Sequence, residues 1–154
     1  MKIGLISDTH GLLRPEALVA LQGCDQIVHA GDIGKPQILE ALAALAPLTQ
    51  VPGNNDEGFD WAAGMPIHVQ LHLPGVGLYL THDIADLPSP LPEGINVVVT
   101  GHSHKPLVRE LDGVLYINPG SAGPRRFKLP ITCAILHVDA NGLRVEPITL
   151  VPAS

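Results

Sequence analysis

Short apolar runs bounded by glycine, proline or aspartate recur along the whole chain and are typical of β-strands. The pattern predicts ten strands: Ile3–Ser7, Gln26–Ala30, Leu48–Val51, Val69–Leu73, Gly77–Thr81, Asn96–Thr100, Val108–Leu111, Val114–Asn118, Ile131–Val138 and Leu143–Leu150.

Two segments repeat apolar residues at helical spacing instead. The first begins at Pro15, a favourable first position in a helix, and ends by Gly23. The second spans Pro36–Ala46, where isoleucine and leucine side chains share one face and Pro47 stops the helix. The first third of the chain therefore alternates strand and helix, which implies right-handed crossovers and a parallel core sheet.

After Ala63 the pattern changes to hairpins. The turn pairs Pro74-Gly75, Asp112-Gly113 and Asn141-Gly142 each separate two predicted strands. Three prolines within Asp83–Gly94 predict an irregular connection there. The strands are too many for one layer and the helices too few to cover them. We expect one α/β domain, residues 1–154, in which two mixed sheets pack face to face.

Composition narrows the possible partners. The chain has 154 residues, 9 Lys and Arg against 15 Asp and Glu, a net charge of −6 and 3% aromatic residues. A nucleic-acid duplex needs a basic surface, so we expect none as partner. No apolar run is long enough to predict a signal peptide or a membrane span, which favours a cytoplasmic protein without a membrane partner. Cys24 and Cys133 lack metal-binding spacing and are expected to be buried, reduced thiols.

Five of the predicted strands end at residues that can bind a metal ion. In open α/β sheets, ligands bind beyond the carboxyl ends of the strands. The motifs at these ends are Asp8-Thr9-His10, Gly31-Asp32, Gly53-Asn54-Asn55-Asp56, His82-Asp83 and Gly101-His102-Ser103-His104. We expect the glycines at positions 31, 53 and 101 to let the backbone turn sharply before each ligand.

The chemistry of these residues indicates the type of ion. Side chains two apart on an extended segment point the same way, so Asp8 with His10, and His102 with His104, can each face one site. A mixture of Asp, Asn and His without Cys suits Mn²⁺, Fe²⁺, Zn²⁺ or Ni²⁺. Seven ligands are too many for one tetrahedral ion, but they suffice for two ions if one carboxylate bridges them.

The motifs DTHG, AGDIG, PGNND, LTH and GHSH, in this order and spacing, resemble those of the calcineurin-like metallophosphoesterase superfamily. They are most similar to its small, single-domain phosphodiesterase branch, which also shares the later Asn118-Pro119-Gly120-Ser121. The resemblance runs from Asp8 to about Arg125. It implies a four-layer α/β/β/α sandwich and hydrolysis of a small phosphoester at two divalent ions, for which we favour Mn²⁺.

The same resemblance implies a ligand set. A first ion is held by Asp8, His10, Asp32 and His104, and a second by Asp32 as bridge, Asn54, His82 and His102. The candidate catalytic residues among these are Asp32, Asn54, His102 and His104. Two ions and two carboxylates leave a local charge of about +2, which attracts phosphate despite the acidic chain. Such ions lower the pKa of a shared water, and the resulting hydroxide attacks phosphorus in line.

Two positions depart from the wider superfamily. Lys35 stands where an Asp is usual, and Asn55 stands where a His is common. Asn55 is a candidate for contact with the substrate. It cannot protonate a leaving group as an imidazole can, so we expect modest turnover and a preference for leaving groups that depart readily.

Further residues are candidates for supporting roles. Asp56 either orients a ligand histidine or serves only as a turn residue. His29, two residues before Gly31, is expected to support the ligands from behind. Arg125, next to Arg126, either contacts the substrate phosphate or lies on the solvated surface.

Two other functions remain open. The first is a non-catalytic scaffold on the same fold, like a retromer subunit that resembles this family but has a degraded site. All seven ligand positions are filled here, which favours an enzyme. The second is a nuclease acting on long DNA or RNA, which the acidic balance disfavours. The natural substrate and the oligomeric state are left open.

Overall fold

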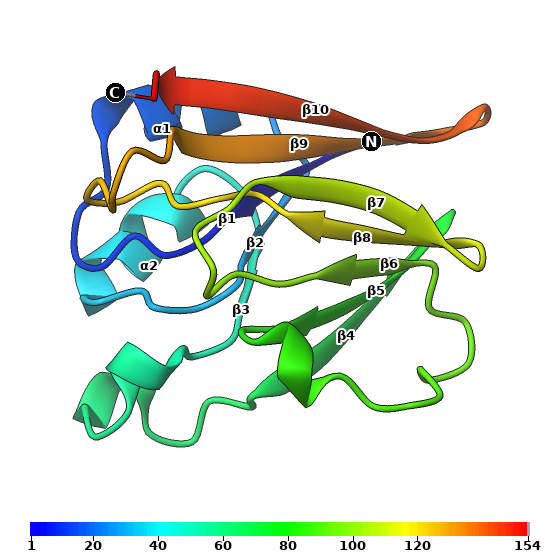
Figure 1. Ribbon diagram of the computed structural model, residues 1–154, viewed down its shortest axis with the longest axis horizontal. Coiled ribbons are helices and arrows are strands. Elements are labelled where there is room, and N and C mark those ends of the chain that lie inside the picture. Colours follow the sequence, from blue (N-terminus) through cyan, green and yellow to red (C-terminus); the bar gives the residue numbers. More distant parts are fainter. Residues whose placement is uncertain (154) are drawn as a thin grey trace.

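Ten strands form two five-stranded sheets that stack on each other (Figure 1). The computed structural model describes residues 1–153. The strands are β1 (Lys2–Ile6), β2 (Gln26–His29), β3 (Leu48–Gln50), β4 (His68–Leu73), β5 (Val76–Thr81), β6 (Val97–Val99), β7 (Leu107–Leu111), β8 (Val114–Asn118), β9 (Ile131–Asp139) and β10 (Gly142–Val151). Each lies within one residue of the strand that the apolar pattern predicts.

The first sheet has the strand order β10-β9-β1-β2-β3. Strands β1, β2 and β3 are parallel, with Leu5 opposite Val28 and Val28 opposite Thr49. Strands β9 and β10 form an antiparallel hairpin that pairs with β1. The parallel centre agrees with the alternation of strand and helix in the first third of the chain, because parallel strands require crossover connections.

The second sheet has the order β4-β5-β6-β8-β7. Its three central strands, β5, β6 and β8, are parallel, with Leu78 opposite Val97 and Val97 opposite Leu115. The outer strands β4 and β7 are antiparallel to their neighbours. Both sheets therefore direct the carboxyl ends of parallel strands to the same side of the molecule, which is the left side in Figure 1.

Apolar side chains fill the space between the sheets. They alternate along the strands with residues that face outward, so each sheet contributes one apolar face. The buried set from the first sheet includes Ile3, Leu5, Val28, Leu136 and Val138, and the set from the second includes Leu78, Leu80, Val97, Val99 and Ile117.

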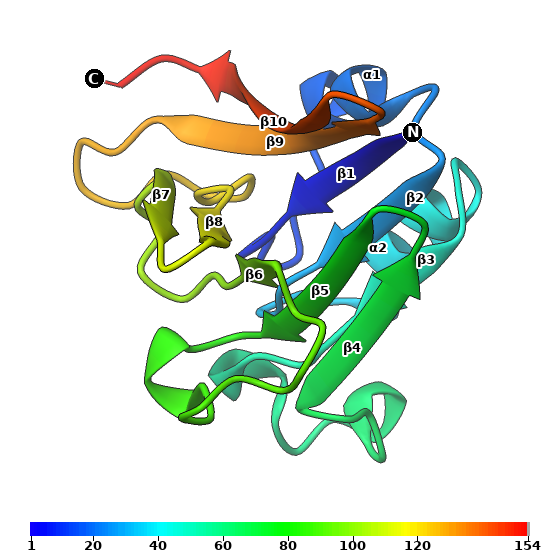
Figure 2. The same cartoon turned by 90° about the vertical axis from the view of Figure 1, so that its right-hand side faces the viewer.

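Helices α1 (Pro15–Leu21) and α2 (Pro36–Ala43) cover the outer face of the first sheet (Figure 2). Both begin at the proline that the sequence indicates. Helix α2 ends three residues before the expected Ala46, because Leu45 N donates to Leu42 O and closes a tighter turn. Within residues 1–153, no helix is long and apolar enough to cross a membrane.

The outer face of the second sheet has a different cover. Tyr79 and Val98 pack there against Leu87, Leu91 and Ile95 from the connection between β5 and β6. As expected from its prolines, this connection is irregular apart from the short 3-10 helix Ile84–Asp86. The α/β sandwich of two mixed sheets is confirmed, and the layer over the outer face of its second sheet is the irregular connection that the prolines predict.

Candidate metal centre

The loops that follow β1, β2, β3, β5 and β6 carry all seven candidate ligands. Three of these strands belong to the first sheet and two to the second. Because their carboxyl ends lie on the same side of the sandwich, the loops meet there (Figure 1). Positions far apart in the sequence, from Asp8 to His104, are thereby brought to one place.

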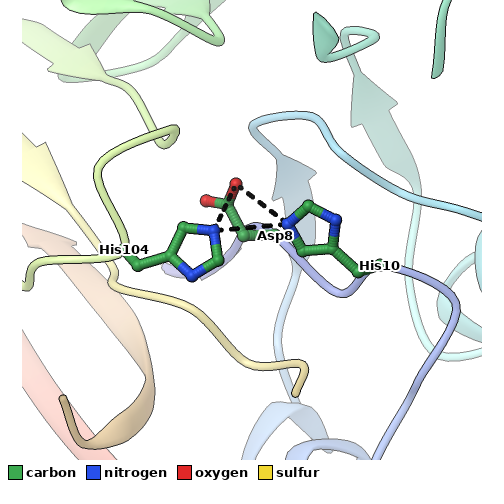
Figure 3. A group of neighbouring side chains, drawn as sticks. All are labelled: Asp8, His10 and His104. Atoms are coloured by element: carbon green, nitrogen blue, oxygen red, sulfur yellow. Dashed lines mark hydrogen bonds and ion pairs between the residues drawn. The ribbon is translucent and has the colours of Figure 1, made fainter. Parts of the chain in front are cut away.

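The first group of side chains consists of Asp8, His10 and His104, whose ligand atoms lie within 4.8 Å of one another. His10 Nε2 and His104 Nε2 are 3.2 Å apart. They lie 3.8 Å and 3.5 Å, respectively, from Asp8 Oδ1. Figure 3 shows the carboxylate and the two imidazole rings pointing toward one another.

Asp8 provides the evidence that this group fits a cation. Its Oδ2 accepts hydrogen bonds from Ser7 Oγ (2.7 Å) and His102 N (3.1 Å). Its Oδ1 is buried and has no hydrogen-bond partner among residues 1–153. Burial raises the pKa of Asp8, and the Ser7 hydrogen bond offsets this only in part. A buried carboxylate oxygen without a partner, beside two imidazole nitrogens, is suited to bind a divalent metal ion.

The second group consists of Asp32, His82 and His102, joined by Asn54. His82 Nε2 lies 3.2 Å from Asp32 Oδ2, 3.3 Å from His102 Nδ1 and 3.1 Å from Asn54 Oδ1. Carboxylate, imidazole and amide oxygen donors thus converge on one point. This is the donor set that Mn²⁺, Fe²⁺ and Zn²⁺ accept.

Asp32 lies between the two groups. Its Oδ2 is 3.2 Å from His82 Nε2 and 3.7 Å from His10 Nε2. Burial by itself would raise the pKa of Asp32, but hydrogen bonds from His82 and from Asn55 N outweigh it and lower the pKa to about 2. The side chain is therefore a carboxylate near neutral pH, as a bridging ligand requires.

His82 is held in one orientation from behind. Its Nδ1 donates to Ala30 O at 2.7 Å, which leaves Nε2 directed at Asp32. Burial by itself would lower the pKa of His82. The neighbouring Asp32 carboxylate raises this pKa by more than burial lowers it, so the net shift is upward. The nearby Asp32 carboxylate thus favours the protonated form of His82, and a metal ion that binds at Nε2 must displace any proton there.

A model of the calcineurin-like phosphoesterase superfamily domain matches residues 1–141. The chain belongs to the calcineurin-like phosphoesterase superfamily. A probable metallophosphoesterase of Methanothermobacter thermautotrophicus is 35% identical over 159 residues, covering 96% of this chain and 92% of that protein.

Solved structures show the same fold. An archaeal phosphodiesterase is 25% identical, with a TM-score of 0.75 over 96% of this chain and 100% of that one. Vps29 of Chaetomium thermophilum shares the fold at 17% identity, with a TM-score of 0.74 over 100% of this chain and 98% of that one. Calcineurin-like phosphoesterases bind divalent metals, and the two groups of side chains are the candidates for that role in this chain.

The backbone of this member of the superfamily is strained at its candidate ligands. Five of the seven have a positive φ, which residues with a Cβ adopt rarely and mostly at functional sites. Loop-to-loop hydrogen bonds maintain it, from Asp8 N to Gly31 O and from His10 N to Asp32 O, both 2.9 Å. The φ angles are 55° at Asp8, 47° at His10, 55° at Asp32, 70° at His102 and 64° at His104.

The three glycines before the ligands do not act in the same way. Gly31 has a φ of 103°, in agreement with the expected sharp turn. Gly53 and Gly101 have no positive φ, yet the chain turns directly after each of them, since Asp56 N donates to Gly53 O and Ser103 N donates to Gly101 O. A Cβ at Gly53 would overlap Asp32 Oδ1, and one at Gly101 would overlap Ser7 Oγ. These two glycines are required because neighbouring loops approach their backbones closely.

The Asp56 side chain binds backbone amides and does not contact a histidine. Its carboxylate accepts hydrogen bonds from Ile33 N (3.0 Å), Gly34 N (3.0 Å) and Gly53 N (2.9 Å). The idea that it orients a ligand histidine was therefore wrong. By binding amides of two loops, Asp56 fixes the loop of Asp32 against the loop of Asn54, which a turn residue alone would not do.

His29 supports the centre through backbone and Thr9. The imidazole is completely buried. Its Nδ1 accepts from Gly31 N at 3.0 Å, so its Nε2 donates to Thr9 Oγ1, also at 3.0 Å. The Thr9 hydroxyl in turn donates to Ile33 O at 2.8 Å. Burial, and then the proximity of His82, lower the pKa of His29 to about 3.

This shift predicts a loss of stability in acid. At pH 5 the unfolded chain, with an ordinary histidine pKa of 6.5, binds a proton that folded His29 does not bind. Its contribution to the free energy of unfolding therefore falls by about 2 kcal/mol between pH 7 and pH 5. We expect His29→Gln to remove this part of the pH dependence in urea denaturation of the metal-free protein. Equal pH dependence in the two proteins would contradict the role of His29.

The two residues expected to contact the substrate form hydrogen bonds within the protein. Asn55 donates to Asp32 from its backbone N (2.9 Å) and its Nδ2 (3.3 Å). Arg125 donates to Leu129 O (3.0 Å) and Pro152 O (2.7 Å). Asn55 thus holds the candidate bridging carboxylate, and Arg125 holds a loop and the C-terminal segment.

Some residues around the centre were missed in the sequence. Ser7 donates to Asp8 Oδ2, and Ser121 Oγ donates to Asp8 O at 3.0 Å. Ser121 belongs to the Asn118-Pro119-Gly120-Ser121 motif, which was a signal for a role at the site. Ser7 carried no such signal, since it only ends an apolar run. Burial, and then the charge of the exposed Arg126, lower the pKa of His104 to about 4.

Proposed function

We propose that this chain is a dinuclear, metal-dependent phosphodiesterase that hydrolyses a small phosphoester. The position of Asp32 carries the proposal: one carboxylate oxygen lies within 3.2–3.7 Å of imidazole nitrogens from both ligand groups. Its low pKa and its contacts with Asn55 suit a permanently charged bridge. The ligands come from both sheets, so the proposal treats residues 1–154 as one catalytic domain.

In this proposal the residues of the chain hold and orient the metal ions, and the ions activate the attacking water. When bound, two divalent ions lower the pKa of a water and stabilise charge on the phosphate oxygens. Asp8, His10 and His104 would hold one ion, and His82, His102 and Asn54 the other, with Asp32 between them. Oxygen and imidazole donors without sulfur support Mn²⁺, with Fe²⁺, Zn²⁺ or Ni²⁺ as substitutes.

Protonation of the leaving group is the step with the least support from this chain. Asn55 occupies the position after Asn54, and its amide donates to Asp32. An amide cannot act as a general acid at neutral pH. Asn55 therefore supplies no proton to the leaving group, which favours esters of acidic alcohols and phenols.

Metal reconstitution tests the proposal. Protein stripped with a chelator is expected to bind two Mn²⁺ per chain and to gain hydrolysis of bis(p-nitrophenyl) phosphate on their addition. The rate with this diester should exceed the rate with p-nitrophenyl phosphate. Metal content by elemental analysis checks the stoichiometry. Fully loaded protein that hydrolyses neither ester would refute the enzyme and leave the scaffold as the better account.

A further inference from the structure

The connection between β8 and β9 carries an exposed aromatic ring among cations. The segment Arg125-Arg126-Phe127-Lys128, together with Lys105, contains four of the nine Lys and Arg of an acidic chain. Phe127 is 85% exposed, more than any other large apolar side chain among the described residues. The metal ligands do not include any of these residues, and the core does not use Phe127.

This connection is fastened to the metal centre at its beginning. Ala122 N donates to Ser7 O at 3.0 Å, and Ser121 Oγ donates to Asp8 O at 3.0 Å. A Cβ at Gly123 would overlap the carbonyl oxygens of Asp8 and Thr9. The segment that follows therefore leaves directly from the edge of the first ligand group, on the left side in Figure 1.

The segment that displays Phe127 is internally braced. Leu129 N donates to Arg126 O at 3.2 Å, and Arg125 Nη1 donates to Leu129 O at 3.0 Å. Pro124 and Pro130 flank the turn and restrict its backbone. Phe127, at its tip, has a φ of 55°, which a bulky residue adopts only where the surroundings enforce it. The loop thus holds an aromatic ring in water at a conformational cost.

The two sides of the metal centre differ in charge. On the His104 side, a hollow of about 580 Å³ is lined by Lys105, Phe127, Lys128 and two apolar residues. This hollow lies beside the first ligand group, because Lys105 in its lining directly follows the candidate ligand His104 in the chain. On the His82 side, the hollow is about 190 Å³ and its charged lining residues are Glu57, Asp83 and Asp86, besides the histidines.

We infer that the Arg126-Phe127-Lys128 turn is a subsite for one arm of the phosphodiester, an arm that carries a flat ring and a second anionic group, as a nucleotide with an additional phosphate does. The ring stacks on Phe127, and the second anion is bound by Arg126 and Lys128. The opposite arm lies toward Asp83 and Asp86 and is uncharged or cationic. This inference rests on the proposed function and adds the substrate class.

Three diesters with the same leaving group separate these contributions. They are methyl p-nitrophenyl phosphate, thymidine 5′-(p-nitrophenyl phosphate), and the latter with a 3′-phosphate. We expect kcat/KM of the Mn²⁺-loaded protein to rise about tenfold with the thymidine and about tenfold again with the second phosphate. A flat series would overturn the inference while leaving the proposed function intact. No hydrolysis of any diester would count against the proposed function.

Variants and a binding measurement assign the effects to the turn. Phe127→Ala is expected to remove the gain in kcat/KM from thymidine. The double variant with Arg126→Gln and Lys128→Gln is expected to remove the gain from the second phosphate. Both should leave the methyl ester rate within about twofold of the parent, as should the control Arg109→Gln on β7. Calorimetry with thymidine 3′,5′-bisphosphate, which needs no turnover, should show weaker binding in both subsite variants. Unchanged gains or unchanged binding in them would overturn the subsite.

Discussion

Substituting Asp32 with asparagine is expected to lower diester hydrolysis by at least about a thousandfold. Loss of a residue that only supports a metal ligand costs about 10–100-fold in metal affinity or activity, and a ligand shared by both groups should cost more. Asparagine keeps the shape of the side chain but removes the charge that offsets two divalent ions. It also replaces one oxygen by an NH₂ group that cannot bind a cation.

The same substitution has a separate consequence for the metal-free protein. Asp32 has a folded pKa of about 2 against an ordinary value of 3.8, so its charge contributes stability that is present above pH 4 and is lost as the pH falls toward 2. The variant should lose about 2 kcal/mol at pH 7 in urea denaturation, a loss too small to unfold a typical domain.

A matched charge change elsewhere separates these effects. Glu110→Gln removes one carboxylate charge from the exposed strand β7 and should leave metal binding and activity unchanged. Elemental analysis should find two Mn²⁺ in this control and fewer in the Asp32 variant. Activity of the Asp32 variant within tenfold of the parent would exclude Asp32 as the bridging ligand.

The elements of this fold could be predicted because local pattern decides them. Buried strands such as Val97–Val99 read as continuous apolar runs, and Pro15 and Pro36 mark the helix starts. The end of α2 was predicted less well, since the choice between an α-helical and a tighter last turn at Leu45 depends on small local energies. The prolines after Asp83 predict that the connection between β5 and β6 is irregular. They do not predict that this connection packs on the outer face of the second sheet.

The positions of the candidate ligands could be predicted from motifs at strand ends, whereas the interactions that hold them could not. Asp56 sits two residues after Asn54, yet it binds amides at Ile33 and Gly34 in another loop. Gly53 is needed because of Asp32, and nothing within its own segment indicates this. Such roles depend on loops from separate strands meeting in space, which a pattern along the chain does not record.

Substituting Gly53 with alanine tests whether this meeting of loops builds the centre. A Cβ there would overlap both Asp32 Oδ1 and Asp32 N, and the second is a backbone atom that cannot rotate away. Asp56 of the same loop accepts hydrogen bonds from Ile33 N and Gly34 N beside Asp32, which prevents the loop from retreating freely. We expect a loss of about 1–3 kcal/mol in the free energy of unfolding and a fall of more than about 100-fold in metal affinity and activity.

Gly58→Ala is the matched control for this substitution. Gly58 follows in the same loop with a φ of 88°, and no atom lies within 4 Å of its added Cβ. Alanine should therefore cost about 1 kcal/mol of backbone strain and leave both ions bound. If Gly53→Ala binds two Mn²⁺ as tightly as Gly58→Ala, the Asp32 carboxylate tolerates displacement by an adjacent loop. The contact between these two loops would then contribute to stability alone, and the placement of Asp32 would have to arise from Asn55 and His82.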